Sequence, residues 1–389
     1  MTSVAERYLR LGLQVGRHVE GIVDAYYGPP ELAAEVEADA PVDARALVSA
    51  AEALLDELDD GWLRDQVAGL RTYVGALAGE AGSYADEVEG CYGVRPTYTD
   101  ESVFTAAHER LDELLAGEGP LAERHTRWEE SIRVPAEQIE RVLAAVIEEA
   151  RARTGDLVEL PDGEGVDLEI VREKPWMAFC GYLGALRSRV AVNVDLPQSA
   201  IGLLRLAIHE TYAGHHAERC VKEHVLVRGR GRLEETLVLV PTPQSLVSEG
   251  IAELAPEVLL DGDGGAALAA AVHDAGIDFD LAHARAVERA YEPCAWADVN
   301  AALMLHDGGA SKEDVQAYLE RWGLMTRQLA AHVVRFLHEP TSRSYVMNYP
   351  AGRGLCRTFV SGRPERFAHL LVEQVRVRDL LEATANARS

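Results

Sequence analysis

Apolar residues recur at the three- and four-residue spacing of an amphipathic helix over most of this 389-residue chain. The same segments are rich in alanine, leucine, glutamate and arginine, which favour helices. We predict helices over residues 3–24, 101–117, 134–154, 199–225, 245–260, 265–275, 281–304, 311–337 and 364–384, with two more inside 42–80. The chain is therefore expected to fold as a large, mainly α-helical protein.

One region departs from the helical pattern. Residues 166–172 and 189–195 alternate apolar and polar side chains, which is typical of strands, and predict a small β-sheet. The segment 156–168 is polar and rich in glycine, so it is the best candidate for a domain boundary. It would separate an N-terminal helical region, 1–155, from a C-terminal region, 156–389. A surface loop within one continuous domain is the alternative.

The charge of the chain narrows the range of partners. It carries 64 acidic and 38 basic residues, a formal net charge of −26. Such a surface repels phosphate backbones and anionic headgroups, so we expect neither a nucleic-acid nor a membrane partner. The N-terminus lacks the basic and apolar segments of a signal peptide, and no apolar stretch is long enough to cross a bilayer. The five cysteines form no Cys-x-x-Cys pair, which indicates reduced thiols. We therefore expect a cytoplasmic protein.

Metal-binding residue types are concentrated in one helical segment. It contains the run His209-Glu210-Thr211-Tyr212-Ala213-Gly214-His215-His216. In a His-Glu-x-x-His helix, two imidazoles one turn apart hold a zinc ion, and the glutamate is the base toward a water molecule. A single histidine on an apolar helix is usually a core residue, but three histidines and a glutamate within eight residues favour metal binding. We predict a zinc site at His209, with Glu210 as the general base.

The spacing of this run does not fit a regular helix. Position i+4 from His209 is Ala213, and the next histidines stand at i+6 and i+7. A helix turns about 100° and rises about 1.5 Å per residue, so neither histidine reaches the same ion without distortion. Gly214 is the residue that leaves helical geometry most readily. A break there would restore the relation of His209 to His215, which we favour over His216. His216 would then bind substrate or orient a ligand.

A third protein ligand is expected further along the chain, because catalytic zinc keeps three ligands and one open position. Glu249 lies in the apolar helical segment 245–260, where an unpaired carboxylate is costly. Glu253 follows one turn later on the same side. We predict Glu249 as the ligand. Glu253 would orient a histidine from behind or form a plain salt bridge. Nitrogen and carboxylate ligands also accept other divalent ions such as manganese or cobalt.

These residues resemble a known family. The pattern His209-Glu210-x-x-x-Gly214-His215-His216, followed by Glu249-Gly250-x-Ala252, is similar to that of the bacterial DUF885 proteins, whose pattern is His-Glu-x-x-Pro-Gly-His-His and then Glu-Gly-Trp-Ala. Those proteins are viewed as relatives of the helical zincin metallopeptidases of the gluzincin type. The resemblance implies a zincin-like helical fold with a substrate groove and a small sheet beside the metal helix. Ala213 and Ile251 depart from the usual proline and tryptophan, which bears on substrate range more than on the metal.

The resemblance extends to a tyrosine- and glycine-containing stretch, 343–354. In related peptidases such a stretch approaches the scissile carbonyl, so Tyr345 or Tyr349 would donate to the oxyanion and Arg353 would pair with a substrate carboxylate. A structural turn is the alternative. Zinc peptidases also pair an extended substrate with an edge strand beside the metal helix. If residues 189–195 form that strand, Asn193 lies near the site; a purely structural strand is the alternative.

Together these features predict a zinc metallohydrolase of the peptidase type. Zinc would be held by His209, His215 and Glu249, and Glu210 would move the proton from water to the leaving amine. The expected substrate is a peptide or a small amide. Two alternatives remain: a metal-dependent enzyme acting on a non-peptide small molecule, and a non-catalytic helical binding protein.

Overall fold

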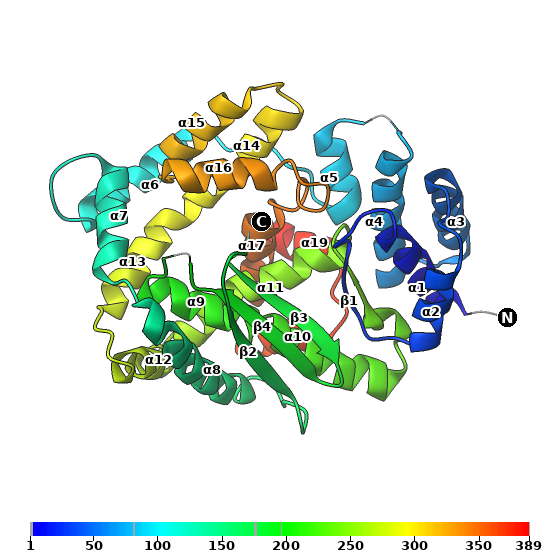
Figure 1. Ribbon diagram of the computed structural model, residues 1–389, viewed down its shortest axis with the longest axis horizontal. Helices are drawn as coiled ribbons and strands as arrows, with labels where there is room; N and C mark the ends of the chain where they lie inside the picture. The colour runs from blue at the N-terminus through cyan, green and yellow to red at the C-terminus, as the bar shows by residue number, and fades with distance from the viewer. Residues whose placement is uncertain (1–2, 81, 175–176, 196, 389) are drawn as a thin grey trace.

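The computed structural model describes residues 3–80, 82–174, 177–195 and 197–388. About 65% of the chain is helical and a few short strands form a small sheet, so the predicted mainly α-helical fold is confirmed. Figure 1 shows the sheet near the centre of the molecule, with the first helices of the chain on one side of it and a long arc of later helices on the other.

The N-terminal part forms helices around a short strand. Its elements are α1 (Val4–Gly16), β1 (Val23–Tyr26), α2 (Pro30–Ala38), α3 (Ala44–Glu57), α4 (Trp62–Leu77) and α5 (Tyr84–Tyr92). The single helix predicted over 3–24 is wrong, because the chain turns after Gly16 and continues as β1. That strand pairs antiparallel with β5 (Leu237–Leu239), so a partner more than 200 residues away decides its conformation.

The middle of the chain contributes three helices and the sheet. The helices are α6 (Glu101–Leu114), α7 (Leu121–Ser131), which was not predicted, and α8 (Ile139–Gly155), preceded by the short η1 (Ala136–Gln138). The strands are β2 (Gly165–Val171), β3 (Ala178–Gly184) and β4 (Arg187–Asn193).

The sheet has the order β2-β4-β3, with β2 parallel and β3 antiparallel to β4. Both predicted strands are present. The expectation that residues 189–195 form an edge strand is wrong, because β4 is the central strand and lies between two partners. The edge beside the helices is instead β3, whose sequence lacks the alternation that marks the other two strands.

The C-terminal half is almost entirely helical. Its elements before the central helix are α9 (Ala200–Glu210), α10 (His215–Lys222), the π-helix η2 (Glu223–Gly229) and η3 (Leu233–Thr236). They are followed by α11 (Pro243–Leu260), α12 (Asp263–Asp274), α13 (Leu281–Tyr291), η4 (Glu292–Ala295), α14 (Trp296–His306), α15 (Lys312–Trp322), α16 (Arg327–Phe336), α17 (Asn348–Val360), α18 (Pro364–Val372) and α19 (Val377–Arg388).

Four predicted helices of this half are divided in the structure. The helix predicted over 199–225 breaks between α9 and α10, and the helix predicted over 364–384 breaks between α18 and α19. The helix predicted over 281–304 is interrupted by the 3₁₀ turn η4. The helix predicted over 311–337 ends at Trp322, and Leu324 has a left-handed backbone. A new helix, α16, then begins with Thr326 as its N-cap, whose side chain accepts from the backbone N–H of Leu329. Within the described part of the chain, no helix is both long and apolar enough to span a membrane.

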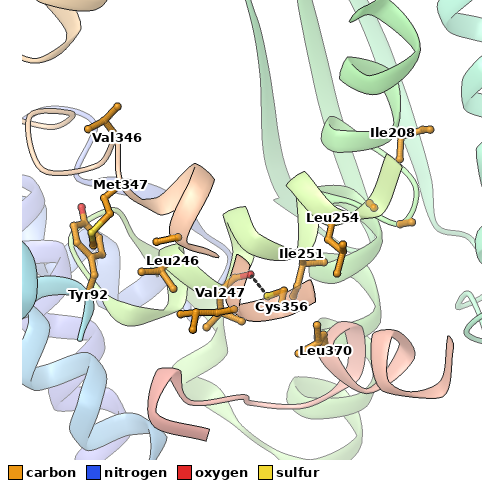
Figure 2. Packing of buried hydrophobic residues seen from close by; sticks show 14 of the residues in the cluster. Tyr92, Ile208, Leu246, Val247, Ile251, Leu254, Val346, Met347, Cys356 and Leu370 are labelled. Atoms are coloured by element: carbon orange, nitrogen blue, oxygen red, sulfur yellow. Dashed lines mark hydrogen bonds between the residues drawn. The ribbon is translucent and has the colours of Figure 1, made fainter. Parts of the chain in front are cut away.

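The buried helix α11 is the centre of the packing. Figure 2 shows its residues Leu246, Val247, Ile251 and Leu254 against side chains from α5, α17 and α18. A Cβ added to Gly250 would lie 2.5 Å from the carbonyl of Gly352 on α17, so glycine at both positions allows the two backbones to touch. This close crossing brings the start of α17 beside Glu249 and Glu253. The main apolar core runs from Tyr8 to Leu380, on both sides of the predicted boundary at residue 155.

Candidate metal centre and cleft

The chain breaks between α9 and α10, as predicted. α9 ends at Glu210 and α10 begins at His215. Ala213, between them, has a left-handed backbone with φ of 68°. A Cβ on Gly214 would lie 1.9 Å from the carbonyl oxygen of His209, so only glycine fits at that position. The chain therefore folds back on the end of α9, and this turn brings His215 close to His209.

Three side chains converge beside this break. The rings of His209 and His215 are nearly perpendicular, with centroids 4.8 Å apart. Glu249 reaches both from α11: its Oε2 lies 3.5 Å from His209 Nε2, and its Oε1 lies 3.4 Å from His215 Nε2. The three residues offer ligand atoms that all lie within 4.8 Å of one another. The structure thus brings together the three predicted metal ligands.

The Nδ1 atom of each imidazole contacts a second side chain. His209 Nδ1 lies 3.3 Å from Glu253 Oε1. His215 Nδ1 lies 3.2 Å from Ser248 Oγ, and this hydroxyl donates its own proton to Glu218. Ser248 must therefore accept from His215 Nδ1, so the neutral form of this ring has its lone pair on Nε2. Partners of this kind are usual behind metal-binding histidines, where they fix the tautomer and the ring orientation.

The electrostatics of the cluster suit a cation. Burial lowers the pKa of His209, but the carboxylates of Glu253, Glu210 and Glu249 outweigh this and raise it to about 9. Burial would raise the pKa of Glu249, but His215 and His209 hold it below its usual value. Glu249 Oε2 is buried and has no hydrogen-bond partner among residues 3–80, 82–174, 177–195 and 197–388. Two imidazole nitrogens and this oxygen fit a divalent ion of the zinc type.

Glu210 stands next to this cluster at the edge of a cleft. It is the last residue of α9 and lines the cleft, and its carboxylate makes no hydrogen bond or ion pair with any residue that the structure describes. Burial raises its pKa, against the lowering effect of His209 and His215. A carboxylate placed in this way is free to accept a proton.

The two predicted tyrosines flank the cluster in different ways. Tyr345 donates a hydrogen bond of 2.7 Å to Glu249 Oε1, so its hydroxyl is already engaged by a predicted ligand. Tyr349, in the first turn of α17, lines the cleft, and its ring packs edge-on against Tyr345. Burial raises the pKa of both phenols well above the usual range, so both are neutral donors. Tyr349 is the better placed of the two to meet a substrate.

His216 faces away from the cleft. It is fully buried, with Nδ1 2.8 Å from Ser188 Oγ and Nε2 2.9 Å from Glu164 Oε2. The expectation that it binds substrate or orients a ligand is wrong, because both ring nitrogens have partners on the opposite side of the helix. Glu164 also accepts from Tyr212, so one carboxylate holds residues before and after Gly214.

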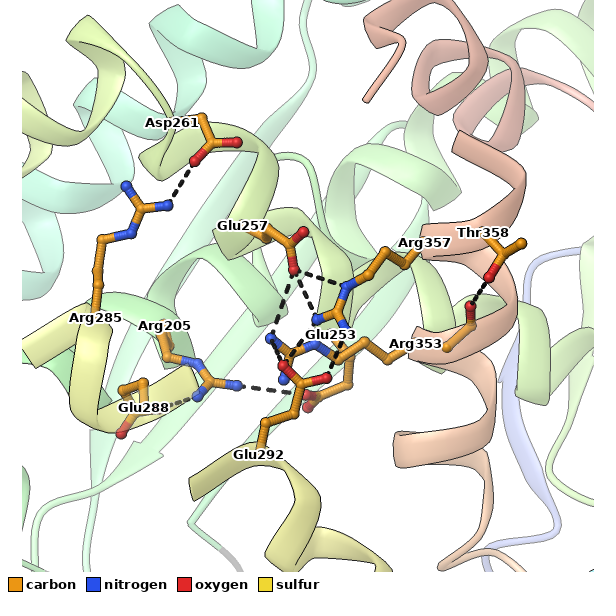
Figure 3. A network of polar contacts seen from close by, with 11 residues as sticks. Arg205, Glu253, Glu257, Asp261, Arg285, Glu288, Glu292, Arg353, Arg357 and Thr358 are labelled. Atoms are coloured by element: carbon orange, nitrogen blue, oxygen red, sulfur yellow. Dashed lines mark hydrogen bonds and ion pairs between the residues drawn. The ribbon is translucent and has the colours of Figure 1, made fainter. Parts of the chain in front are cut away.

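Two other predicted site residues lie outside the cleft. The Asn193 side chain donates to the carbonyl of Lys174 and accepts from the backbone N–H of Asp195, so it fixes the end of β4. Arg353 lies 3.2 Å from Glu292, inside the network of arginines and glutamates in Figure 3. Neither lines the cleft. Arg353 is therefore paired within the chain, and its predicted role toward a substrate carboxylate is not supported by its position.

The same network reaches the cluster through Glu253. Arg205, one turn before His209 on α9, lies 3.5 Å from Glu253 and also pairs with Glu288 on α13 (Figure 3). Arg205 thus fixes the carboxylate that faces His209 Nδ1. The predicted orienting role of Glu253 agrees with this placement.

The cleft has a volume of about 1040 Å³. It begins at His209, Glu210 and Tyr349, and its walls come from α7, β3, α9, α11, α13, α16 and the segment that follows α16. A volume of this size lies at the upper end of the range that is usual for ligand pockets.

Three contributors to the site were not predicted. Ser248 and Glu164 act through His215 and His216, as described above. Asp24 of β1 is close enough to Arg219, His215 and Glu249 for their charges to act on its pKa, which burial raises. The signal for Asp24 was present in the sequence as an acidic residue inside the apolar run Ile22-Val23-Asp24-Ala25. Its meaning depends on pairing between β1 and β5, which local pattern does not reveal.

Ala213 provides a test of the break itself. A left-handed backbone costs an alanine roughly 1–2 kcal/mol, and glycine adopts it freely. Ala213→Gly is therefore expected to stabilise the protein by about 0.5–1 kcal/mol, after the entropy gained by the unfolded chain is subtracted. Urea unfolding would measure the change. Ala217→Gly, within α10, is the matched control and should destabilise by about 1 kcal/mol or more. Equal losses in both variants would show that Ala213 is not strained.

The fold and the cluster together define a mainly helical protein with a histidine–carboxylate centre at one end of a large cleft. No protein family and no curated protein matches the sequence. Two solved structures share the fold. One is described as "the putative lipoprotein from Colwellia psychrerythraea", with a TM-score of 0.57 and 13% identity over 88% of this chain and 66% of that one. The other is "a putative lipoprotein of unknown function from Shewanella oneidensis", with a TM-score of 0.50 and 12% identity over 98% and 73%. At these identities the likeness shows the fold alone.

Proposed function

We propose that this protein is a divalent-metal-dependent hydrolase, with zinc as the ion, that cleaves peptide or related amide bonds. One observation carries the proposal: His209, His215 and Glu249 converge on a common point, with the unpaired carboxylate of Glu210 beside them at the cleft. The likeness of these residues to the DUF885 pattern, and of that family to zincin metallopeptidases, supports the same reaction class.

The metal would be held by the Nε2 atoms of His209 and His215 and by the carboxylate of Glu249. When bound, a zinc ion supplies Lewis-acid polarisation of the water and of the substrate carbonyl. Glu253 and Ser248 keep both imidazoles in the tautomer that presents Nε2. Tyr345 holds Glu249 from the other side.

Glu210 would act as general base and then as general acid. It takes a proton from the attacking water as the oxygen bonds to the carbonyl carbon. It returns that proton to the nitrogen as the carbon–nitrogen bond breaks, so the products are a carboxylic acid and an amine. Tyr349, neutral and at the cleft, would donate a hydrogen bond to the carbonyl oxygen as negative charge develops there.

The edge strand β3 is the place where an extended substrate would lie. Its first residue, Ala178, lines the cleft, and among the strands that the structure describes β3 pairs only with β4. A peptide could therefore add to this strand near Ala178 through backbone hydrogen bonds. This role was predicted for residues 189–195; because β4 is the central strand of the sheet, we propose β3 for it instead.

We retain the cytoplasm as the proposed compartment. All five cysteines are free thiols in the structure, and four of them are buried. Reduced, unpaired cysteines are usual for proteins of that compartment.

Metal removal tests the proposed function. Protein loaded with zinc is expected to bind one ion per chain and to hydrolyse members of a quenched fluorescent peptide library. Chelation should abolish the hydrolysis, and added zinc should restore it. A parallel panel of small amides separates peptide cleavage from other amide hydrolysis. Zinc well below one ion per chain that does not rise when zinc is added, with no turnover of either panel, would contradict the proposal.

A further inference from the structure

The wall of the cleft formed by α16 carries a cation without an acidic partner. Arg335 lines the cleft, its side chain is exposed, and no carboxylate in the described chain pairs with it. Among the described residues, its guanidinium makes one hydrogen bond, to His332 Nδ1 at 3.4 Å on the same helix. The other arginine of the cleft, Arg205, is paired with both Glu288 and Glu253. Arg335 therefore has its donors available for a ligand.

The surroundings make this cation distinctive. The chain has a net charge of −26, and the cleft is also lined by Glu129, Glu288 and Glu339. Glu339 lies four residues after Arg335, beyond the end of α16, and forms no ion pair with it in the described structure. The carboxylates that line the cleft repel an anion, whereas Arg335 attracts one. Arg335 thus determines where an anionic group of a ligand can lie in the cleft.

His332 adds a second donor at the same place. Because Arg335 donates to its Nδ1, the neutral ring carries its proton on Nε2. Burial lowers the pKa of His332, and the charge of Arg335 acts in the same direction, so the ring is neutral near pH 7. Both residues line the cleft, and together they offer guanidinium and imidazole N–H groups.

This pair is joined to the candidate centre by continuous chain. After α16, the residues Thr341 and Ser342 line the same cleft, and the chain then reaches Tyr345 and Tyr349 beside Glu249. One segment thus forms the wall from the cation pair to the reacting end. A ligand held at both ends would lie along it.

We infer that Arg335, with His332, binds a carboxylate of the substrate, and that the preferred substrates are peptides in which a free carboxylate lies at a fixed position relative to the cleaved bond. A planar guanidinium matches a carboxylate with two parallel hydrogen bonds. The inference rests on the proposed function, because it takes the substrate to be a peptide. The carboxylate is either the C-terminus or an aspartate or glutamate side chain.

Matched peptides test it in the zinc-loaded protein. One pair differs only in a free or amidated C-terminus, and a second pair only in aspartate or asparagine near the cleaved bond. In one of these pairs the acidic member carries the carboxylate that Arg335 recognises. The neutral member of that pair is expected to have a kcat/KM about 10- to 100-fold lower, mainly because KM rises. This is the effect expected when a charge-assisted hydrogen bond is lost. Arg335→Ala should lower kcat/KM for the acidic member to a similar extent and change little for the neutral member.

Arg327→Ala is the matched control. Arg327 lies at the start of the same helix, is exposed, does not line the cleft, and has no ion pair among the described residues. It should leave both members unchanged. Arg335→Lys should restore part of the preference, because it keeps the charge without the planar fork. Equal losses on acidic and neutral peptides in Arg335→Ala, or no preference in the parent, would overturn the inference.

A binding measurement separates failure of the inference from failure of the proposed function. Calorimetry on Glu210→Gln and on Glu210→Gln/Arg335→Ala, with the same peptide pairs, requires no turnover. Tighter binding of one acidic member that depends on Arg335 supports the inference even if no peptide is cleaved. Cleavage without any preference for a carboxylate retains the hydrolase and removes the inference.

Discussion

Replacing Glu210 with glutamine is expected to lower the rate of amide hydrolysis by about 10²- to 10⁴-fold while the zinc content stays at one ion per chain. Glutamine keeps the size of the side chain and removes the ability to accept a proton. The carboxylate of Glu210 makes no hydrogen bond or ion pair within the described chain, so the substitution removes no polar contact that supports the fold. The loss should fall on kcat, because proton transfer occurs in the transition state and not on binding.

Glu129→Gln is the control for this variant. Glu129 lines the same cleft from α7, and burial together with Glu288 raises its pKa to about 7. The substitution Glu129→Gln therefore removes a carboxylate from the same cleft and leaves His209, His215 and Glu249 unchanged. Most of the activity should remain. Steady-state kinetics and metal analysis of both variants give the comparison. If Glu210→Gln turns over as fast as the parent, another group moves the proton.

The candidate centre was largely predictable because its geometry is local. The i+6 spacing of His209 and His215 cannot serve one ion on a regular helix, so a break was required, and Gly214 was the residue able to provide it. The structure places the break there and shows the reason: a side chain on Gly214 would strike the carbonyl of His209. Glu249 was predictable because burying an unpaired carboxylate on an apolar helix costs free energy, so this side chain needs a partner.

Three of the errors concern partners that are distant in the sequence. His216 looked like a second site histidine until Glu164, more than 50 residues earlier, was seen to hold it on the other face. Arg353 looked available until Glu292 was found beside it. β1 was assigned to a helix because its pairing with β5 spans most of the chain. Local periodicity describes one element at a time, and it carries no information about which distant side chain satisfies a buried charge.

The two adjacent histidines should respond to substitution in opposite ways. His215→Ala removes a nitrogen that faces Glu249, so zinc affinity is expected to fall by more than about 100-fold. Loss of a residue that only supports a metal ligand lowers metal affinity by about 10- to 100-fold. The fold should tolerate the change, because His215 is partly exposed and its loss leaves Ser248 still paired with Glu218.

His216→Ala is expected to keep one zinc ion per chain but to lower the free energy of unfolding by about 2–4 kcal/mol. The imidazole is fully buried, and its removal takes one hydrogen-bond partner from Glu164 and one from Ser188. Because Glu164 keeps Tyr212 and Arg151, the cost should stay below that of an isolated buried charge. Metal analysis after dialysis and urea unfolding of both variants distinguish the two roles. If His216→Ala loses the metal and His215→Ala retains it, the chain places the other histidine at the ion, and the convergence of His209, His215 and Glu249 is not a metal site.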